Sequence, residues 1–193
     1  MTCSDCFVPS ITDYIGYYKD CMSEDVCDEI IENVETQRSS DLNQSRFSDH
    51  EGRKGLENQR VSMDDLWFRN GEKFFDSFKL AFNNVIKNYS KEHKLFHCQH
   101  HTDFRLNKYS EGGFMSKHCD NIHHSHGQEY GFPQVSALLF LNDDYEGGEF
   151  IIAGEIYNPK KGSGIAFPSN FIYPHEVLPI SKGTRWSVIT WLM

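Results

Sequence analysis

The chain lacks a long apolar run, a basic leader and an excess of positive charge. No stretch of about eighteen apolar residues occurs, so we expect neither a membrane-spanning helix nor a membrane partner. Residues 1–20 do not join a basic start to an apolar segment, so we expect no secretory signal and a cytoplasmic protein. The chain contains 19 Lys and Arg against 28 Asp and Glu, which gives a net charge of −9. We expect no nucleic-acid partner, because this charge repels the phosphate backbone.

Six cysteines could in principle form three disulfides. A chain of this length without an export signal is expected to keep them as thiols. Cys3 and Cys6 with Cys21 and Cys27 suggest a zinc site, but no second Cys-X-X-Cys or His pair completes it, and Cys27 falls on the apolar side of a predicted helix. Cys3 and Cys6 therefore receive no assigned role.

Length and composition favour one globular domain. Hydrophobic residues make up 38% of the 193 residues and charged residues 24%, which is ordinary for a protein with a substantial core. We expect a single domain over residues 1–193, in which residues 1–99 supply helical support and a polar connector and residues 100–193 the main core. Nothing in the sequence indicates the oligomeric state.

Two helices are predicted in the N-terminal half. The first begins after Ser23, a favourable N-cap residue followed by acidic residues, and the second covers about residues 70–89. Between them, residues 37–60 form a long polar connector, for which a lid and a solvated insertion are both open interpretations. The apolar residues at helical spacing are Val26, Cys27, Ile30, Ile31 and Val34 in the first helix, and Phe75, Phe78, Phe82, Val85, Ile86 and Tyr89 in the second.

The period of the apolar pattern changes to two after residue 100. Short alternating segments separated by Gly, Pro, Asn and Asp predict many short strands, which is typical of a jelly roll. Helices first and strands afterwards predict an α+β fold, with the helices packed on one sheet. The predicted strands cover residues 104–109, 114–120, 135–141, 149–153, 164–167, 173–178 and 185–192.

His118 and Asp120 are the strongest candidates for a metal site. On a strand, residues i and i+2 point to the same face, so both could hold one ion, and His175 from a distant strand could complete the set. Two His and one carboxylate with open coordination positions is the arrangement of non-haem Fe(II) oxygenases. The pair alone is not specific, because His101-Thr-Asp103 repeats it, and a solvated polar pair is the plain alternative.

Arg185 follows His175 by ten residues and opens the last predicted strand. Alternation places Ser187 on the same face as Arg185. A guanidinium offers two parallel donors that match a carboxylate, and Ser187 could add a third. A dicarboxylate bound to Arg185 at its far end and to the metal through its oxo-acid end fits this arrangement. The alternative is a surface Arg in an ordinary salt bridge.

The order of motifs over residues 100–193 resembles the prolyl 4-hydroxylase-like Fe(II)/2-oxoglutarate dioxygenases. The segments that carry the resemblance are Tyr109-X-X-Gly112-X-Phe114-X-X-X-His118-X-Asp120, Leu138–Asp143, Glu146-Gly-Gly-Glu-Phe150, Pro159-Lys-Lys-Gly162, Phe167-Pro-Ser169, His175-Glu-Val-Leu-Pro179 and Gly183-Thr-Arg185. Collagen-type members usually carry Lys at the position of Arg185, whereas small bacterial and oxygen-sensing members often carry Arg.

The resemblance implies a double-stranded β-helix, or jelly-roll, core. It implies Fe(II) held by His118, Asp120 and His175, and 2-oxoglutarate held by Arg185 and Tyr109, with no catalytic residue beyond the metal ligands. Dioxygen is the co-reactant and ascorbate an optional one. The implied activity is hydroxylation of a prolyl or other peptidyl side chain with release of succinate and CO2. Two alternatives stay open: hydroxylation of a free amino acid or small metabolite, and a catalytically silent metal- or carboxylate-binding sensor.

Three histidines lie in the segment just after Asp120. We expect His123, His124 and His126 to contact substrate rather than bind a second metal, because loops beside a site commonly carry binding residues. Solvated side chains are the plain alternative.

Overall fold

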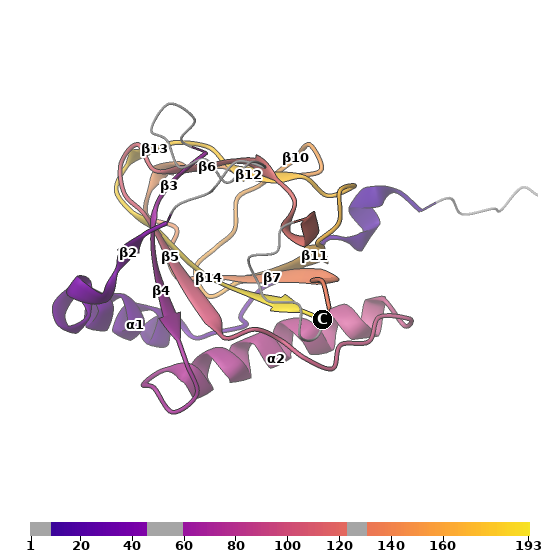
Figure 1. Cartoon of the computed structure of the whole chain (residues 1–193), viewed down its shortest axis with the longest axis horizontal. Coiled ribbons are helices and arrows are strands. Elements are labelled where there is room, and N and C mark those ends of the chain that lie inside the picture. The colour runs from indigo at the N-terminus through magenta and orange to yellow at the C-terminus, as the bar shows by residue number, and fades with distance from the viewer. Residues whose placement is uncertain (1–8, 46–59, 123–130) are drawn as a thin grey trace, which may run out of the picture.

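Two antiparallel sheets face each other, and helices cover the outer side of the larger one (Figure 1). The computed structural model describes residues 9–45, 60–122 and 131–193. Cys3, Cys6, the three histidines of residues 123–126 and most of the connector 37–60 lie outside these ranges, so their predicted roles stay predictions.

The larger sheet is the platform of the fold. Along the sheet its strands are β1 (Gly16–Tyr18), β11 (Gly164–Pro168), β7 (Val135–Phe140), β14 (Arg185–Leu192), β5 (Phe104–Tyr109), β4 (Asp64–Phe68) and β2 (Asn43–Gln44). The facing sheet contains β10 (Glu155–Tyr157), β9 (Phe150–Ile152), β12 (His175–Val177), β6 (Phe114–His118) and β3 (Val61–Ser62). A short pair joins β13 (Ile180–Lys182) to β8 (Glu146–Gly147).

The predicted start of the first helix is confirmed. Helix α1 (Glu24–Gln37) begins after Ser23, although the Ser23 side chain makes no capping hydrogen bond. Its residues Cys27, Ile30 and Val34 are fully buried, whereas the outer part of the predicted apolar side, Val26 and Ile31, is only partly buried. The helix therefore presents a narrower apolar stripe to the core than the sequence suggested.

The predicted start of the second helix was wrong. Helix α2 (Phe75–Glu92) begins five residues later than expected. Gly71 and Phe74 have positive φ values of 89° and 70°, which a right-handed helix cannot contain, so the segment before Phe75 forms turns. The predicted apolar side itself is confirmed, since Phe78, Phe82 and Tyr89 are buried against the sheet.

Part of the predicted polar connector is regular structure. A 3-10 turn (Ser39–Asp41) leads into β2, which pairs with β4 through Asn43 and Asp65. The sequence did not predict β1 to β4, β8, β10 or β13. Strand β4 is the largest omission, and its adjacent Asp64 and Asp65 obscure an alternation in which Leu66 and Phe68 face the helices.

Alternation along the central strands divides the core into two layers. Trp186, Val188 and Leu192 of β14 pack between the sheet and the helices. Ile189 and Trp191 pack between the two sheets. All eight residues of β14 are buried, so the polar side chains on its inner face lie inside the protein.

Four of the six cysteines lie in the described ranges. They are free thiols: Cys21, Cys27, Cys98 and Cys119. Burial raises the pKa of Cys21 and Cys27 to about 11, so both stay protonated at neutral pH.

Within the described ranges, no helix has the length and apolar character required to cross a bilayer.

Candidate active site

The structure brings together the three predicted metal ligands. His118 ends β6 and His175 begins β12, and the two residues are register partners in adjacent strands. One ligand atom from each of His118, Asp120 and His175 lies within 4.8 Å of the others, and this is the only such cluster in the described ranges. The His101-Thr-Asp103 pair is not part of it: His101 is exposed and stacks on Phe104.

Asp120 reaches the cluster from a different element than predicted. Strand β6 ends at His118, and Asp120 begins a 3-10 turn (Asp120–Ile122). The turn, and not the alternation of one strand, therefore directs the carboxylate toward the two imidazoles. Its Oδ1 lies 3.5 Å from His118 Nε2 and its Oδ2 lies 3.5 Å from His175 Nε2.

Backbone carbonyls orient both imidazoles for metal binding. His118 Nδ1 lies 2.9 Å from the carbonyl oxygen of Ser116, and His175 Nδ1 lies 3.2 Å from that of Tyr173. A carbonyl only accepts, so each Nδ1 carries the proton and each Nε2 presents its lone pair to the centre. This is the usual outer support of metal-binding histidines.

The pKa values of the centre favour the protonation states that bind a cation. Burial lowers the pKa of His175 to about 4, against the opposing effect of Asp120, so this imidazole is neutral at pH 7. Burial alone would raise the pKa of Asp120, but the two neighbouring imidazoles and the hydrogen bond from Ser136 hold it well below its ordinary value. A neutral imidazole and an ionised carboxylate are what a divalent metal requires.

Ser136 is a supporting residue that the sequence analysis missed. Its Oγ donates to Asp120 Oδ2 at 2.5 Å and lies 2.8 Å from Ser169 Oγ, and both serines are fully buried. Ser136 thereby fixes the carboxylate from β7 of the opposite sheet. The sequence offered one sign of this role: Ser136 is a polar residue near the start of a predicted strand that is otherwise apolar.

Arg185 lies between the sheets with part of its hydrogen-bonding capacity unused. The residue is 1% exposed, and Nη1 donates to Ser187 Oγ at 3.3 Å. Nε and Nη2 have no hydrogen-bond partner among the described residues, nor does any described carboxylate lie within ion-pair distance. A buried guanidinium with two free donors on one edge is costly unless an anion occupies it, and a carboxylate fits that edge.

Tyr109 and two further aromatic rings define the rest of the Arg185 pocket. Tyr109 is the register partner of Arg185, and the guanidinium carbon lies 5.1 Å from its ring centroid. Burial raises the pKa of Tyr109, with Arg185 opposing this, so its hydroxyl stays protonated and can donate. The rings of Phe140 and Phe150 lie 5.4 and 5.7 Å from the same carbon and keep the pocket apolar.

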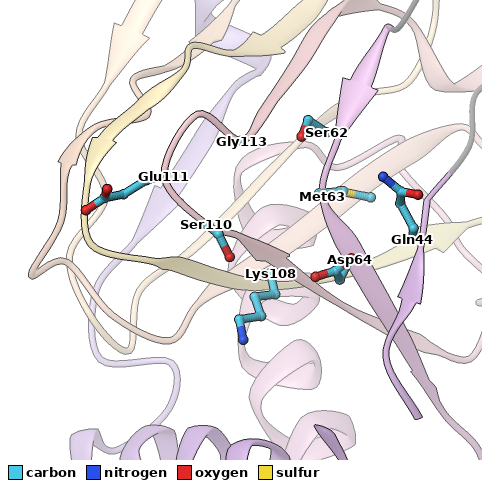
Figure 2. A pocket seen from close by; sticks show the side chains of 8 residues that line it. All are labelled: Gln44, Ser62, Met63, Asp64, Lys108, Ser110, Glu111 and Gly113. Carbon is cyan, nitrogen blue, oxygen red and sulfur yellow. The ribbon is translucent and has the colours of Figure 1, made fainter. Parts of the chain in front are cut away.

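A separate shallow recess lies outside this centre. Figure 2 shows that residues of β2, β3, β4, the end of β5 and the turn between β5 and β6 line it. Its volume is about 70 Å³. Asp64 and Lys108, which are register partners, border it on the outer side of the sheet.

A family model describes the C-terminal part of the chain. Residues 104–193 match the 2OG-Fe(II) oxygenase superfamily. The C-terminal part of this chain is therefore similar to that superfamily. The name of that superfamily specifies Fe(II) and 2-oxoglutarate, and the arrangement of His118, Asp120, His175 and Arg185 fits both reagents.

Curated relatives share part of their length with this chain. Prolyl 3-hydroxylase 2 of Homo sapiens is 43% identical over 70 residues, which cover 32% of this chain and 10% of that protein. A PKHD-type hydroxylase of Rippkaea orientalis is 34% identical over 106 residues, covering 52% of this chain and 42% of the relative. The chain thus spans less than half the length of these relatives.

Solved structures share the fold over nearly the whole chain. A Pseudomonas putida prolyl-4-hydroxylase has a TM-score of 0.71 at 19% identity and covers 93% of this chain and 91% of its own. A Trichoplax adhaerens prolyl hydroxylase, in complex with a hypoxia inducible factor peptide fragment, has a TM-score of 0.72 at 15% identity, with 94% and 84% coverage. These similarities confirm the predicted α+β jelly roll.

Proposed function

We propose that the chain is an Fe(II)- and 2-oxoglutarate-dependent dioxygenase that hydroxylates a prolyl or other peptidyl side chain and releases succinate and CO2. The observation that carries the proposal is the convergence of His118, Asp120 and His175 opposite a buried Arg185 with two free donors. A peptidyl substrate is supported by the prolyl hydroxylases among the relatives and by the peptide bound to one structural neighbour.

Each residue has a separate task in the proposed reaction. His118, Asp120 and His175 would hold Fe(II), which with 2-oxoglutarate and dioxygen supplies the oxidising chemistry. Arg185 and Tyr109 would hold the far carboxylate of 2-oxoglutarate. Three protein ligands would leave coordination positions of the ion free for cosubstrate and dioxygen, and no general base is assigned.

Aromatic packing protects the centre from water. The ring of Phe167 lies 4.9 Å from that of His175, and Phe150 lies 6.1 Å from it, both edge to face. Ordered rings on this side fix the imidazole and exclude solvent from behind it. Exclusion of water limits side reactions of an oxidising centre.

We further infer that residues 1–193 act as one domain. Helix α2 packs on β7 and β11 of the central sheet, and its Phe82 stacks on Phe104 of β5 at 5.2 Å. Cooperative packing across the N- and C-terminal parts predicts a single thermal unfolding transition. Two separated transitions would contradict this inference.

Turnover with a peptide panel tests the proposed activity. The protein with Fe(II), 2-oxoglutarate and oxygen should release succinate faster when a prolyl peptide is added, and the peptide should gain the mass of one oxygen atom. The His175→Ala variant should lose this activity, whereas His101→Ala, an exposed His in the similar His-X-Asp motif, should keep it.

The same assay separates the alternatives. Hydroxylation of free L-proline, with no peptide modified, would favour the small-metabolite alternative. Binding of Fe(II) and 2-oxoglutarate without oxygen consumption under any condition would favour a silent sensor and contradict the proposal.

A further inference from the structure

A second arginine faces the space between the sheets. The residues of β5 alternate, so Arg105, Asn107 and Tyr109 point inward while Phe104 and Leu106 point to the helices. The Arg105 guanidinium carbon lies 4.8 Å from the centroid of the Trp191 ring. Its Nε donates to Asn107 Oδ1 at 3.0 Å, so the head group has a fixed position.

The charge of Arg105 has no direct counter-ion. No carboxylate of the described ranges lies within ion-pair distance of it, and Asp65 and Asp120 act on it only at longer range. Asp65 on β4 instead accepts a short hydrogen bond from Ser45 Oγ. Burial lowers the pKa of Arg105, but a guanidinium stays charged at physiological pH. The bond to Asn107 is the hydrogen bond that its guanidinium makes within the described ranges, and the residue is only partly buried.

The strand register separates Arg105 from the cosubstrate pocket. Arg185 pairs with Tyr109, whereas Arg105 pairs with Ile189, four residues further along β14. Four residues of a strand span about 13 Å. On the other side of β14, Trp191 pairs with Ser136, the residue that holds Asp120. Arg105 thus lies toward the metal end of β14 and on its β4 side.

We propose that Arg105 binds a carboxylate group of the substrate and so selects substrates that carry one near the reacting carbon. This inference deepens the proposed function and rests on it. A planar carboxylate can accept two parallel N–H groups and supplies the missing counter-charge, whereas a neutral carbonyl leaves the charge uncompensated. A phosphate dianion is disfavoured, because the net charge of −9 repels a dianion more strongly than a carboxylate monoanion.

Two kinds of substrate could provide the carboxylate. It could be the α-carboxylate of a C-terminal residue or free amino acid, or the side chain of an acidic residue next to the target residue. The chemistry at Arg105 is the same in both cases. Two matched pairs of probes distinguish them: acetyl-Ala-Pro with a free or an amidated C-terminus, and acetyl-Ala-Pro-Glu-Ala amide against the same peptide with Gln in place of Glu.

Anaerobic calorimetry on the full chain loaded with Fe(II) and 2-oxoglutarate tests the proposal. In at least one pair the carboxylate member should bind about tenfold to a hundredfold more tightly than its neutral partner. Arg105→Gln should abolish that difference and Arg105→Lys should retain part of it. Arg69→Gln, a change at an exposed arginine, should leave it intact.

Several results would overturn the proposal. These are equal affinities within both pairs, no binding of any probe, or a preference that persists in Arg105→Gln. A matching loss of 2-oxoglutarate affinity in Arg105→Gln would place Arg105 in the cosubstrate pocket instead. Thermal unfolding of Arg105→Gln and of Arg105→Met, which keeps an unbranched chain against Trp191, provides the folding control. If neither variant folds, Arg105 is structural and the proposal fails.

Failure of this inference is distinguishable from failure of the proposed function. Peptide hydroxylation that does not depend on Arg105 would leave the proposed function standing without the carboxylate subsite. Binding of a carboxylate probe that depends on Arg105, with no succinate released in oxygen, would leave the subsite standing without the proposed reaction.

Discussion

The two inner faces of the jelly roll differ in how far their polar groups are satisfied. On the facing sheet, His118 and His175 each use Nδ1 to contact a backbone carbonyl, and Asp120 is fixed by Ser136. On the larger sheet, Arg185 keeps two unused donors, and Arg105 makes one hydrogen bond, to Asn107. The metal side is therefore preorganised by the protein, whereas the arginine side needs ligands to complete it.

This difference gives distinct consequences for mutations on the two sides. Substitutions of the metal ligands should abolish Fe(II) binding and therefore the whole reaction. Substitutions on the arginine side should weaken carboxylate binding while the metal stays in place. Each prediction below can break or sharpen this distinction.

The largest expected effect is on the arginine side. Arg185→Gln removes a charged fork with two donors, each worth about 1.5–3 kcal/mol when hydrogen-bonded to a charged group, so 2-oxoglutarate affinity should fall about a hundredfold or more. Fe(II) affinity should change little. Equilibrium binding of both ligands checks this, with Arg69→Gln as the surface control. An equal loss of Fe(II) binding would show that the two sides are not separable.

The second effect is a pH dependence of stability on the metal side. Burial lowers the pKa of His175 to about 4 from an unfolded value of about 6.5. Between these values the unfolded chain binds a proton that the folded chain does not, so the unfolding free energy of the iron-free protein should rise with pH. The full shift corresponds to a change on the order of 3 kcal/mol.

Chemical denaturation at several pH values measures this slope. The His175→Gln variant should lose most of the pH dependence between about pH 4 and pH 6.5. A variant with the slope of the wild type would show that another group causes it.

A smaller effect is expected from the support of the carboxylate. Ser136→Ala removes the donor to Asp120 Oδ2, and loss of such an outer partner typically lowers metal affinity or activity about tenfold to a hundredfold. The 2-oxoglutarate affinity of the iron-loaded variant should stay near that of the wild type. Metal titration detects the change, and unchanged Fe(II) affinity would mean that the turn holds Asp120 without Ser136.

The smallest effect concerns Tyr109. Tyr109→Phe removes one neutral hydroxyl donor and preserves the ring beside Arg185, so 2-oxoglutarate affinity should fall only about threefold to tenfold. The ratio of this effect to that of Arg185→Gln measures how much of the binding energy comes from charge. A loss of affinity as large as that of Arg185→Gln would contradict the proposal that the charge of Arg185 supplies most of the binding energy.

Sequence periodicity and spacing predicted the fold class and the residues of the metal cluster. The alternation in β5 and β14 is visible in the sequence because each face has a different environment. The route of Asp120 through a 3-10 turn was not predictable, since a break in a strand after His118 has no clear signal in local composition. The start of α2 was missed because Phe74 adopts a positive φ that only tertiary packing can impose.

Partners contributed by distant strands were also beyond the sequence analysis. Ser136 and Arg105 stand on strands whose neighbours are set by the topology of the larger sheet, so their proximity to Asp120 and Trp191 depends on register. Motif spacing identifies ligands that share a segment. It does not identify residues that approach from the opposite sheet.

Anaerobic titration with Fe(II) and 2-oxoglutarate tests the central claim most directly. The weak visible absorption of the Fe(II)–2-oxoglutarate chelate should develop to one equivalent per chain in the wild type and in His101→Ala, and it should be absent in His118→Ala. Full absorption in His118→Ala would contradict the account, because the metal would then bind somewhere other than between His118, Asp120 and His175.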